Sequence, residues 1–382
     1  MKKIAVAISL LIMLCPVVLF AEIDESQSKP ILVLDEPNNV LSAKTDSNNS
    51  TKSQAQLDAQ LIEAVENVED FNSIKQALDS GANPNCTNPN SSSLIFKLIW
   101  SQAKSPEKKE DKCLRALNIL FDSGAKLQWW CDNEILLIPI TKGFPKVVSL
   151  LIDKGVDPNK TTGGRSPVEL AEYYGQTEVV SVLIKRGATP ISRREAAQLR
   201  LVKCSCDGDI SGIELAIQNG ALINEKIKTG ETALTEAVNS ADVFPEHAIV
   251  TIAYLLKKGA DPDIAGEHGD KPLHRAMFST FAQLGFDANN LPPSKQLIEE
   301  QASCKLIIEA LLQAGAKVSS RNKHEQTPLH IAAKWNNLWG ARKLIESGAK
   351  LMDRDDSGKT PLDYAESAEM IKLLKSHGAT EQ

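Results

Sequence analysis

Stretches that alternate apolar and polar positions with a helical period, and that stop at a glycine, recur along most of this chain. Strings such as "LIDKGVDPN", "LLKKGADPD" and "LIESGAKLM" each end an apolar stripe with a glycine, and a polar turn follows. Glycine readily takes the left-handed conformation that ends a helix. Four of the eight spacings between these glycines are 31 to 33 residues, so the pattern predicts a repeated unit. The glycines are Gly81, Gly124, Gly155, Gly187, Gly220, Gly259, Gly315, Gly348 and Gly378.

A second type of helix start follows several of the polar turns. It reads "RSPVELAEYYG", "GETALTEAV", "GDKPLHRAM", "EQTPLHIAA" and "GKTPLDYAE". In most of these a serine or threonine caps the helix, and proline often occupies the first turn, where no amide donor is lost. Each unit is therefore expected to hold two short helices, which bury their apolar faces only by stacking on neighbouring units.

These residues resemble the ankyrin repeat. The signature T-P-L-H-x-A stands intact at residues 327–332, and close variants stand at 166–171, 232–237, 271–276 and 360–365. The resemblance covers residues 57–380 and implies an all-α solenoid of about nine helix-turn-helix units with short hairpin turns. The sequence departs from the family pattern at Pro139, which falls inside a first helix, at "QLRLVKCSC", which has no Thr-Pro, and in the last unit, which is three residues short.

The N-terminal segment differs from the rest of the chain. Lys2 and Lys3 precede an uncharged apolar run at residues 4–20, which predicts a secretory signal peptide at 1–21. Residues 22–56 are rich in Ser, Asn, Asp and Lys without a sustained period and predict a flexible linker, so the repeat domain is expected at 57–382. We therefore expect a periplasmic or secreted protein. An uncleaved membrane anchor is the alternative, because Leu19 stands where a cleavage site prefers a small residue.

Three insertions interrupt the period, near residues 101–112, 239–247 and 279–303, each between the first and second helix of its unit. The last is long enough for an extra helix at 294–303 that continues into "CKLIIEALL". Long loops often carry function, so an enzyme or ligand-binding activity in residues 279–303 is an alternative to a pure scaffold. Tolerated variation in loop length is the other interpretation.

Composition narrows the class of partner. The chain is 42% hydrophobic and 24% charged, as globular proteins are, and its net charge is −6. It therefore lacks the basic balance that nucleic acid or an anionic membrane surface would require. We expect a monomer that binds a protein partner, with no nucleic acid and no membrane contact after signal cleavage.

Aromatic residues recur where the family places its binding groove. The resemblance implies that the two residues after the Ala-Ala pair of each first helix face the concave groove. Four of the eight such pairs contain an aromatic residue, although aromatics make up only 5% of the chain. Such side chains dominate interface energies, whereas the alternative is that each ring packs against the neighbouring unit. The predicted partner-binding residues are Trp100, Tyr173, Tyr174, Phe278 and Trp335, with Trp129 and Trp130 at a projecting hairpin tip.

Other candidate chemistry is sparse. The sequence shows no catalytic motif, no metal-ligand spacing and no cofactor motif, and the resemblance implies that the histidines of the "PLH" signature bond locally. Cys86 and Cys131 fall in successive turns and form the one disulfide pair we expect. Cys204 is expected to be buried at an alanine position. Together with Cys206 it suggests the remaining alternative, a redox or stress accessory protein of the envelope. The favoured reading is a non-enzymatic scaffold acting as an inhibitor, immunity factor or effector.

Overall fold

The described part of the chain is helical. The structure is a computed structural model that describes residues 52–66, 71–87, 93–103, 110–127, 134–162, 164–242, 245–267, 269–278 and 295–380. Within these ranges lie eighteen α-helices, α2 to α19, one short 3-10 helix and two isolated β-bridges, but no strand. The prediction of an all-α repeat solenoid is confirmed. The chain divides into two compact units, residues 1–132 and 133–382.

The first unit contains two helix pairs. In each pair a first, inner helix is followed by a second, outer helix, and like helices pack on each other, α2 on α4 and α3 on α5. The amide of Asn85 donates to the Gly124 carbonyl (3.0 Å) and its oxygen accepts from the Lys126 amide (2.7 Å), which joins successive turns. The helices are α2 (Gln54–Glu66), α3 (Phe71–Asp79), α4 (Leu94–Ala103) and α5 (Glu110–Asp122), so the helical region begins at Gln54.

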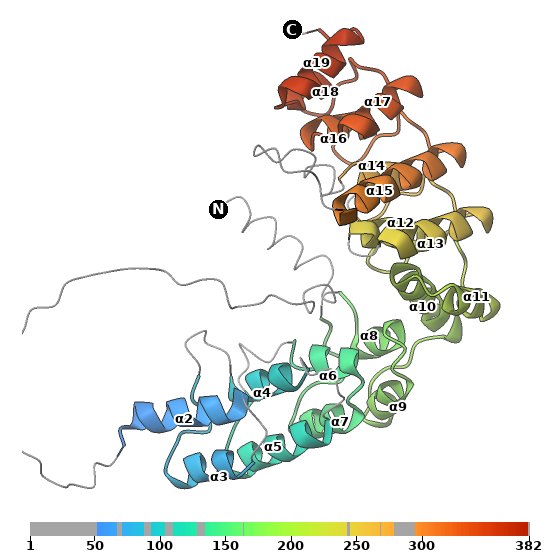
Figure 1. Cartoon of the computed structure of the whole chain (residues 1–382). Helices are drawn as coiled ribbons and strands as arrows, with labels where there is room; N and C mark the ends of the chain where they lie inside the picture. The colour runs from blue at the N-terminus through green and yellow to red at the C-terminus, as the bar shows by residue number, and fades with distance from the viewer. Residues whose placement is uncertain are drawn as a thin grey trace, which may run out of the picture. The chain divides into compact units, whose positions relative to one another are not determined.

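The second unit contains seven helix pairs that stack in chain order (Figure 1). Its inner helices are α6 (Leu137–Lys142), α8 (Pro167–Tyr173), α10 (Arg193–Asp207), α12 (Ala233–Asn239), α14 (Pro272–Met277), α16 (Pro328–Lys334) and α18 (Pro361–Tyr364). Its outer helices are α7 (Pro145–Asp153), α9 (Thr177–Lys185), α11 (Ile210–Gln218), α13 (Pro245–Lys257), α15 (Lys295–Gln313), α17 (Leu338–Glu346) and α19 (Ala368–Ser376), and the 3-10 helix η4 (Ser240–Asp242) precedes α13.

Several inner helices begin with the side-chain caps that the sequence predicts. At α8 the Ser166 hydroxyl accepts from the Glu169 amide (3.3 Å), while the Glu169 carboxylate accepts from the Ser166 amide (2.7 Å). This reciprocal pair satisfies two amides that a helix start would otherwise leave without partners. Pro167 occupies the first helical position, where its missing donor costs nothing. The start of this short inner helix is thus specified by residues within its own first turn.

Packing between pairs supplies the core. Four residues before the glycine that ends each outer helix stands a buried apolar side chain, which is fully buried at Leu183, Leu255, Leu311 and Leu344. One apolar cluster extends from Ala197 to Ala379 through all the intervening pairs. Burying one leucine contributes about 1.5–3 kcal/mol, and the core in which most of these leucines are buried is shared between successive pairs. A single pair therefore cannot hold its own fold.

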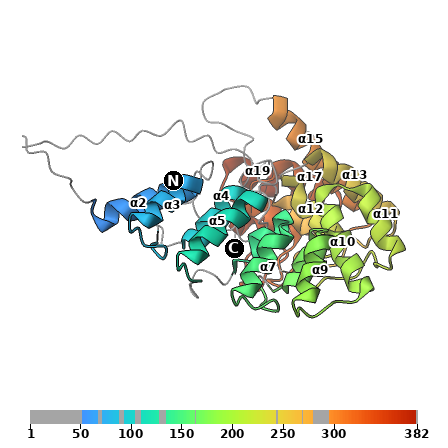
Figure 2. The ribbon, with the colours of Figure 1, turned by 90° about the horizontal axis from the view of Figure 1, so that it is seen from below.

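The departures from the repeat have local explanations. Helix α6 begins at Leu137, so Pro139 lies in its first turn, where the lost donor is tolerated. Helix α15 runs for 19 residues and extends beyond its neighbours, which confirms the extra helix predicted in the third insertion (Figure 2). Helix α10 has 15 residues, about two turns more than α8 or α12, and helix α18 only four.

Candidate functional site

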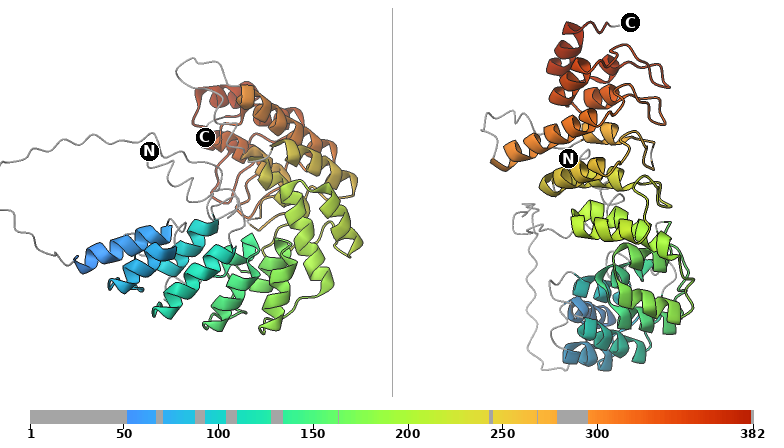
Figure 3. Two further views of the ribbon diagram at one scale, coloured as in Figure 1. Left: turned by 60° about the horizontal axis from the view of Figure 1, so that its bottom comes forward. Right: turned by 90° about the vertical axis from the view of Figure 1, so that its right-hand side faces the viewer.

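Five loops of the second unit, the fingers, connect an outer helix to the next inner helix. They span residues 157–165, 224–231, 261–270, 317–326 and 353–359, and those of the C-terminal pairs project to one side of the helices (Figure 3). Four tips are closed by the same two backbone bonds, for example from the Gly269 amide to the Gly266 carbonyl (3.1 Å) and from the Gly266 amide to the Asp270 carbonyl (2.9 Å). A repeated tip geometry lets neighbouring fingers stack.

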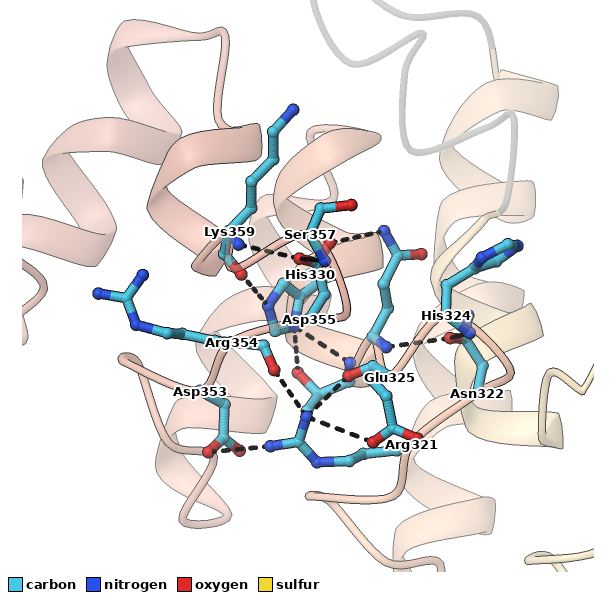
Figure 4. Close-up of polar contacts among 12 residues, drawn as sticks. Arg321, Asn322, His324, Glu325, His330, Asp353, Arg354, Asp355, Ser357 and Lys359 are labelled. Atoms are coloured by element: carbon cyan, nitrogen blue, oxygen red, sulfur yellow. Dashed lines mark hydrogen bonds and ion pairs between the residues drawn. The ribbon is translucent and has the colours of Figure 1, made fainter.

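Polar side chains join the last two fingers (Figure 4). Arg321 Nη1 donates to the carbonyls of Arg354 (2.7 Å) and Glu325 (2.9 Å). Its Nη2 lies 3.5 Å from the Asp353 carboxylate. One guanidinium thus closes its own finger and fixes the next, so the two fingers present their tips as one surface.

A buried carboxylate shapes the last finger. Asp355 Oδ1 accepts from the amides of Ser357 (3.0 Å) and Lys359 (2.9 Å), and its Oδ2 accepts from the Tyr364 hydroxyl (2.5 Å). Burial alone would raise the pKa of Asp355, but these hydrogen bonds outweigh it and lower the pKa. The ionised carboxylate therefore holds both the finger and the Tyr364 ring in place.

The signature histidines bond locally, which confirms their predicted role. His330 Nδ1 accepts from the Thr327 amide (3.1 Å), and its Nε2 donates to the Lys359 carbonyl of the next finger (3.1 Å). His274 repeats the pattern with Lys271 (3.3 Å) and Gln326 (2.9 Å). Burial lowers the pKa of both imidazoles, which favours the neutral form that this bonding requires. These side chains hydrogen-bond to the neighbouring unit and therefore have a structural role.

A nearly buried ionic cluster lies at the base of two fingers. Arg275 of α14 faces Glu231 at 3.7 Å and Asp270 at 3.6 Å, and its Nη1 donates to Asn239 (3.2 Å). Buried atoms Nε and Nη2 of Arg275 and Oε2 of Glu231 have no hydrogen-bond partner among the described residues. A carbon added at Gly266 would lie 2.6 Å from that Glu231 oxygen. The cluster therefore fixes how closely the fingers approach.

The side chain of Tyr173 is buried and does not lie on the surface. Its side chain is only 6% exposed, the Arg165 guanidinium lies 4.0 Å above its ring, and its hydroxyl donates to Glu236 (3.4 Å). Burial, followed by the charge of Glu236, raises the pKa of the Tyr173 hydroxyl. Its neighbour Tyr174 meets it edge-on at 5.2 Å and is half-buried. Of these two predicted binding rings, Tyr174 alone offers area to a partner.

No finger precedes α10, and the fingers on either side of it meet. The two extra turns of α10 occupy the corresponding stretch of chain. The Arg165 guanidinium donates to the Thr229 hydroxyl (3.4 Å), and the Lys228 ammonium pairs with Glu169, so elements two pairs apart are joined directly. A second small apolar cluster, of Tyr173, Leu199, Val202 and Ile227, lies here.

The other predicted aromatic residues are placed as follows. Phe278 and Trp335 are half-buried, and their ring centres lie 5.4 Å apart at a 45° tilt, so the structure brings α14 and the end of α16 together through them. Trp100, in the first unit, is 39% exposed and stacks on Phe96. Trp129 and Trp130 lie outside the described residues. The binding role of all these rings stays a prediction.

Tyr364 is a surface ring that the sequence reasoning missed. It stands at the x position of T-P-L-H-x-A, whereas we considered only the two residues after the Ala-Ala pair. The ammonium groups of Lys334 and Lys359 lie 6.0 Å and 5.2 Å from its ring centre. The pattern "PLDYAE" itself contains the signal, because the x position holds a large side chain in two other units as well, Arg275 and Glu236.

The cysteines offer little reactive chemistry. Cys204 is half-buried and not fully buried as predicted, because Ser205 takes the innermost position of α10. Burial raises the pKa of its thiol to about 11, and that of Cys113 to about 12. Cys131 lies outside the described residues, so the Cys86–Cys131 pairing stays a prediction.

Metal-binding clusters and membrane-spanning helices are absent from the described ranges. No three His, Cys, Asp or Glu side chains there converge as a metal site would require. Across the same ranges, no helix is both long and apolar enough to cross a bilayer.

Comparisons with known proteins agree with this architecture. Residues 299–381 match the family model described as ankyrin repeats (3 copies). The ankyrin repeat protein FPV031 of fowlpox virus (strain NVSL) is 29% identical over 54% of this chain and 45% of its own length. The NF-kappa-B inhibitor delta of Mus musculus is 24% identical over 55% of this chain and 65% of its own. The poly(ADP-ribose) polymerase tankyrase of Caenorhabditis elegans is 29% identical over 31% of this chain, but over 5% of its own length.

These matches each cover only part of the proteins concerned, and the chain spans less than half of the fowlpox protein. The family match at residues 299–381 includes the T-P-L-H start of α16 and its variant at α18. Residues 299–381 thus match the ankyrin repeat family, and the other described helix pairs have the same architecture.

Proposed function

We propose that this protein is a non-enzymatic scaffold that binds a partner protein through the inner helices and fingers of its second unit. The observation that carries the proposal is the presence of half-buried aromatic rings on that face, Tyr174, Trp335 and Phe278, beside fingers fixed by a polar network. Rings that are already ordered lose little entropy on binding and contribute large contact areas. Ankyrin repeats generally serve protein–protein interaction, which the similarity to an NF-kappa-B inhibitor illustrates.

The proposed setting is the periplasm or the extracellular space, on the evidence of the N-terminal sequence. Lys2 and Lys3 before an apolar run support export, and the acidic net charge of −6 supports a protein partner over nucleic acid. Action as a monomeric inhibitor, immunity factor or effector fits an exported scaffold without a catalytic motif. Mass spectrometry of the protein from cell fractions tests export, because a cleaved signal yields an N-terminus near residue 22.

The binding role is tested by quantitative co-purification. Wild type is compared with Trp335→Ala plus Tyr174→Ala, which removes the two rings, and with Leu215→Ala plus Val250→Ala as a matched control. The control residues are exposed apolar side chains on outer helices, 55% and 60% accessible. A partner that is lost with the first variant and kept with the second supports the proposal. Equal recovery of every partner with all three proteins contradicts it.

A further inference from the structure

Two exposed lysines that form no ion pair with a described residue lie close to the last two inner helices. Lys334 ends α16 and Lys359 ends the last finger, and both side chains are exposed. Neither ammonium group is among the ion pairs of the described ranges. Other lysines nearer the middle of the unit differ, because Lys203 pairs with Asp207, and Lys228 with Glu169 and Glu195. Lys334 and Lys359 therefore differ from these two lysines, which have carboxylate partners.

The two ammonium groups converge on one fixed ring. They lie 6.0 Å and 5.2 Å from the centre of Tyr364. The ring itself is held by its hydroxyl, which donates to Asp355 (2.5 Å) and accepts from Gln326 (3.0 Å), and by an edge contact with His330 at 6.0 Å. A cation above an aromatic face is attracted to the ring but keeps its full charge. The arrangement orders two donors and leaves both able to bind an anion.

Nearby carboxylates are already engaged elsewhere. Asp355 accepts from the last finger and from Tyr364, as described above. Asp363 accepts from the amide (2.7 Å) and hydroxyl (2.8 Å) of Thr360 at the start of α18. Asp356 lies 3.6 Å from His324 on the preceding finger. The local acids thus bond mainly to backbone and finger donors. The Thr360 bonds and, less strongly, the charges of Arg354 and Lys359 lower the pKa of Asp363, but neither Lys334 nor Lys359 forms an ion pair with a local acid that the structure describes, so both can bind an external anion.

The geometry points to an acidic segment of a partner protein as the ligand of this surface, with carboxylates on Lys334 and Lys359 and its chain passing over Tyr364. The inference rests on the proposed scaffold function and specifies the chemistry of the partner. Carboxylates suit the site better than a nucleic-acid backbone, because the two cations are isolated on a chain of net charge −6 and form no extended basic track. Trp335 follows Lys334 directly, so an apolar residue in the same segment would meet an aromatic side chain.

The test selects displayed random peptides on the full-length protein and measures their affinity as synthetic peptides by fluorescence anisotropy. Selected peptides are expected to be rich in Asp and Glu. They should lose about tenfold or more in affinity for Lys334→Gln plus Lys359→Gln, because charge-assisted bonds at two sites are removed. Lys372→Gln plus Lys375→Gln is the matched control. It removes the same charge from exposed positions on α19 and should change affinity by less than about twofold at equal ionic strength.

The possible outcomes separate this inference from the function on which it rests. Peptides that bind through Trp335 and Tyr174, but without acidic residues or without dependence on the two lysines, overturn the inference and leave the scaffold function standing. Peptides indifferent to Trp335→Ala plus Tyr174→Ala, or no selected peptides at all, count against both. Single-stranded DNA or polyphosphate that binds the two lysines more tightly than the acidic peptides overturns the assignment to a polypeptide. Unchanged thermal unfolding of each variant ensures that the comparison concerns binding.

Discussion

The stacking of the fingers can be tested with one added methyl group. Gly269 and Gly358 occupy the same tip position in two fingers, with φ of 78° and 75°. A carbon added at Gly269 would lie 2.9 Å from both the backbone nitrogen and the Cβ of Lys323, whereas at Gly358 it would meet nothing within 4 Å. Gly269→Ala and Gly358→Ala thus share the backbone strain but differ in the contact with the next finger.

The two costs are estimated separately. A left-handed alanine costs about 1–2 kcal/mol, and this applies to both variants. A contact of 2.9 Å with backbone cannot be relieved by a side-chain rotation, so the fingers must separate, which costs about 1–3 kcal/mol more. We expect Gly269→Ala to lower the free energy of unfolding by more than Gly358→Ala by that second amount.

Urea unfolding followed by circular dichroism measures this difference, with wild type and both variants at one pH. Hydrogen exchange of the amides in residues 261–270 and 317–326 shows whether the loss is local to the two fingers. Equal destabilisation by the two substitutions, within about 0.5 kcal/mol, would refute the claim that adjacent fingers are in backbone contact.

Three further predictions concern the same region and the half-buried thiol of Cys204. Glu325 has a φ of 56°, and its ion pair with Arg321 at 3.7 Å is exposed. Glu325→Gly should therefore raise the free energy of unfolding by about 0.5 kcal/mol in the urea assay. A lower free energy of unfolding would contradict backbone strain at this tip. The pKa of His274 and of His330 is lowered from 6.5, so the unfolded chain binds more protons than the folded protein just below pH 6.5. Stability should therefore fall there as the pH drops, by up to about 1.4 kcal/mol per pH unit for each histidine. His330→Gln should reduce this slope in pH-dependent melting, and an unchanged slope would show that other groups cause it. The pKa of about 11 at Cys204 predicts slow reaction with Ellman's reagent at about pH 8 in the native protein and fast reaction in urea, and fast native reaction would restore the redox alternative.

Local signals predicted the fold well. The glycine at the end of each outer helix and the capped T-P-L-H starts are short-range features, so one sequence suffices to find them. The same holds for His274 and His330, whose partners lie three residues away on one side and on the next finger on the other. The helix at the start of α15 was found because its period continues that of "CKLIIEALL".

The candidate site was predicted less well, because side-chain exposure depends on distant residues. Tyr173 occupies a register position that the family directs into the groove, but Arg165 and Glu236, one before it and one well after it in sequence, enclose its ring. That enclosure follows from the missing finger before α10. The absence of Thr-Pro in "QLRLVKCSC" showed that this unit departs from the repeat, but not that the neighbouring fingers would meet around Tyr173. Tyr364 was missed for the opposite reason, because a register rule taken from the family restricted attention to other positions.

The extended helix α10 also limits how this array can change in length. Most junctions between pairs are alike, so a unit duplicated there would find familiar neighbours on both sides. At α10 the flanking fingers touch each other through Arg165, Thr229 and Lys228, and an inserted unit would break every one of those bonds. Growth or loss of repeats during evolution should therefore spare this junction, and a designer who wishes to lengthen the protein should add units toward the C-terminal side of α12.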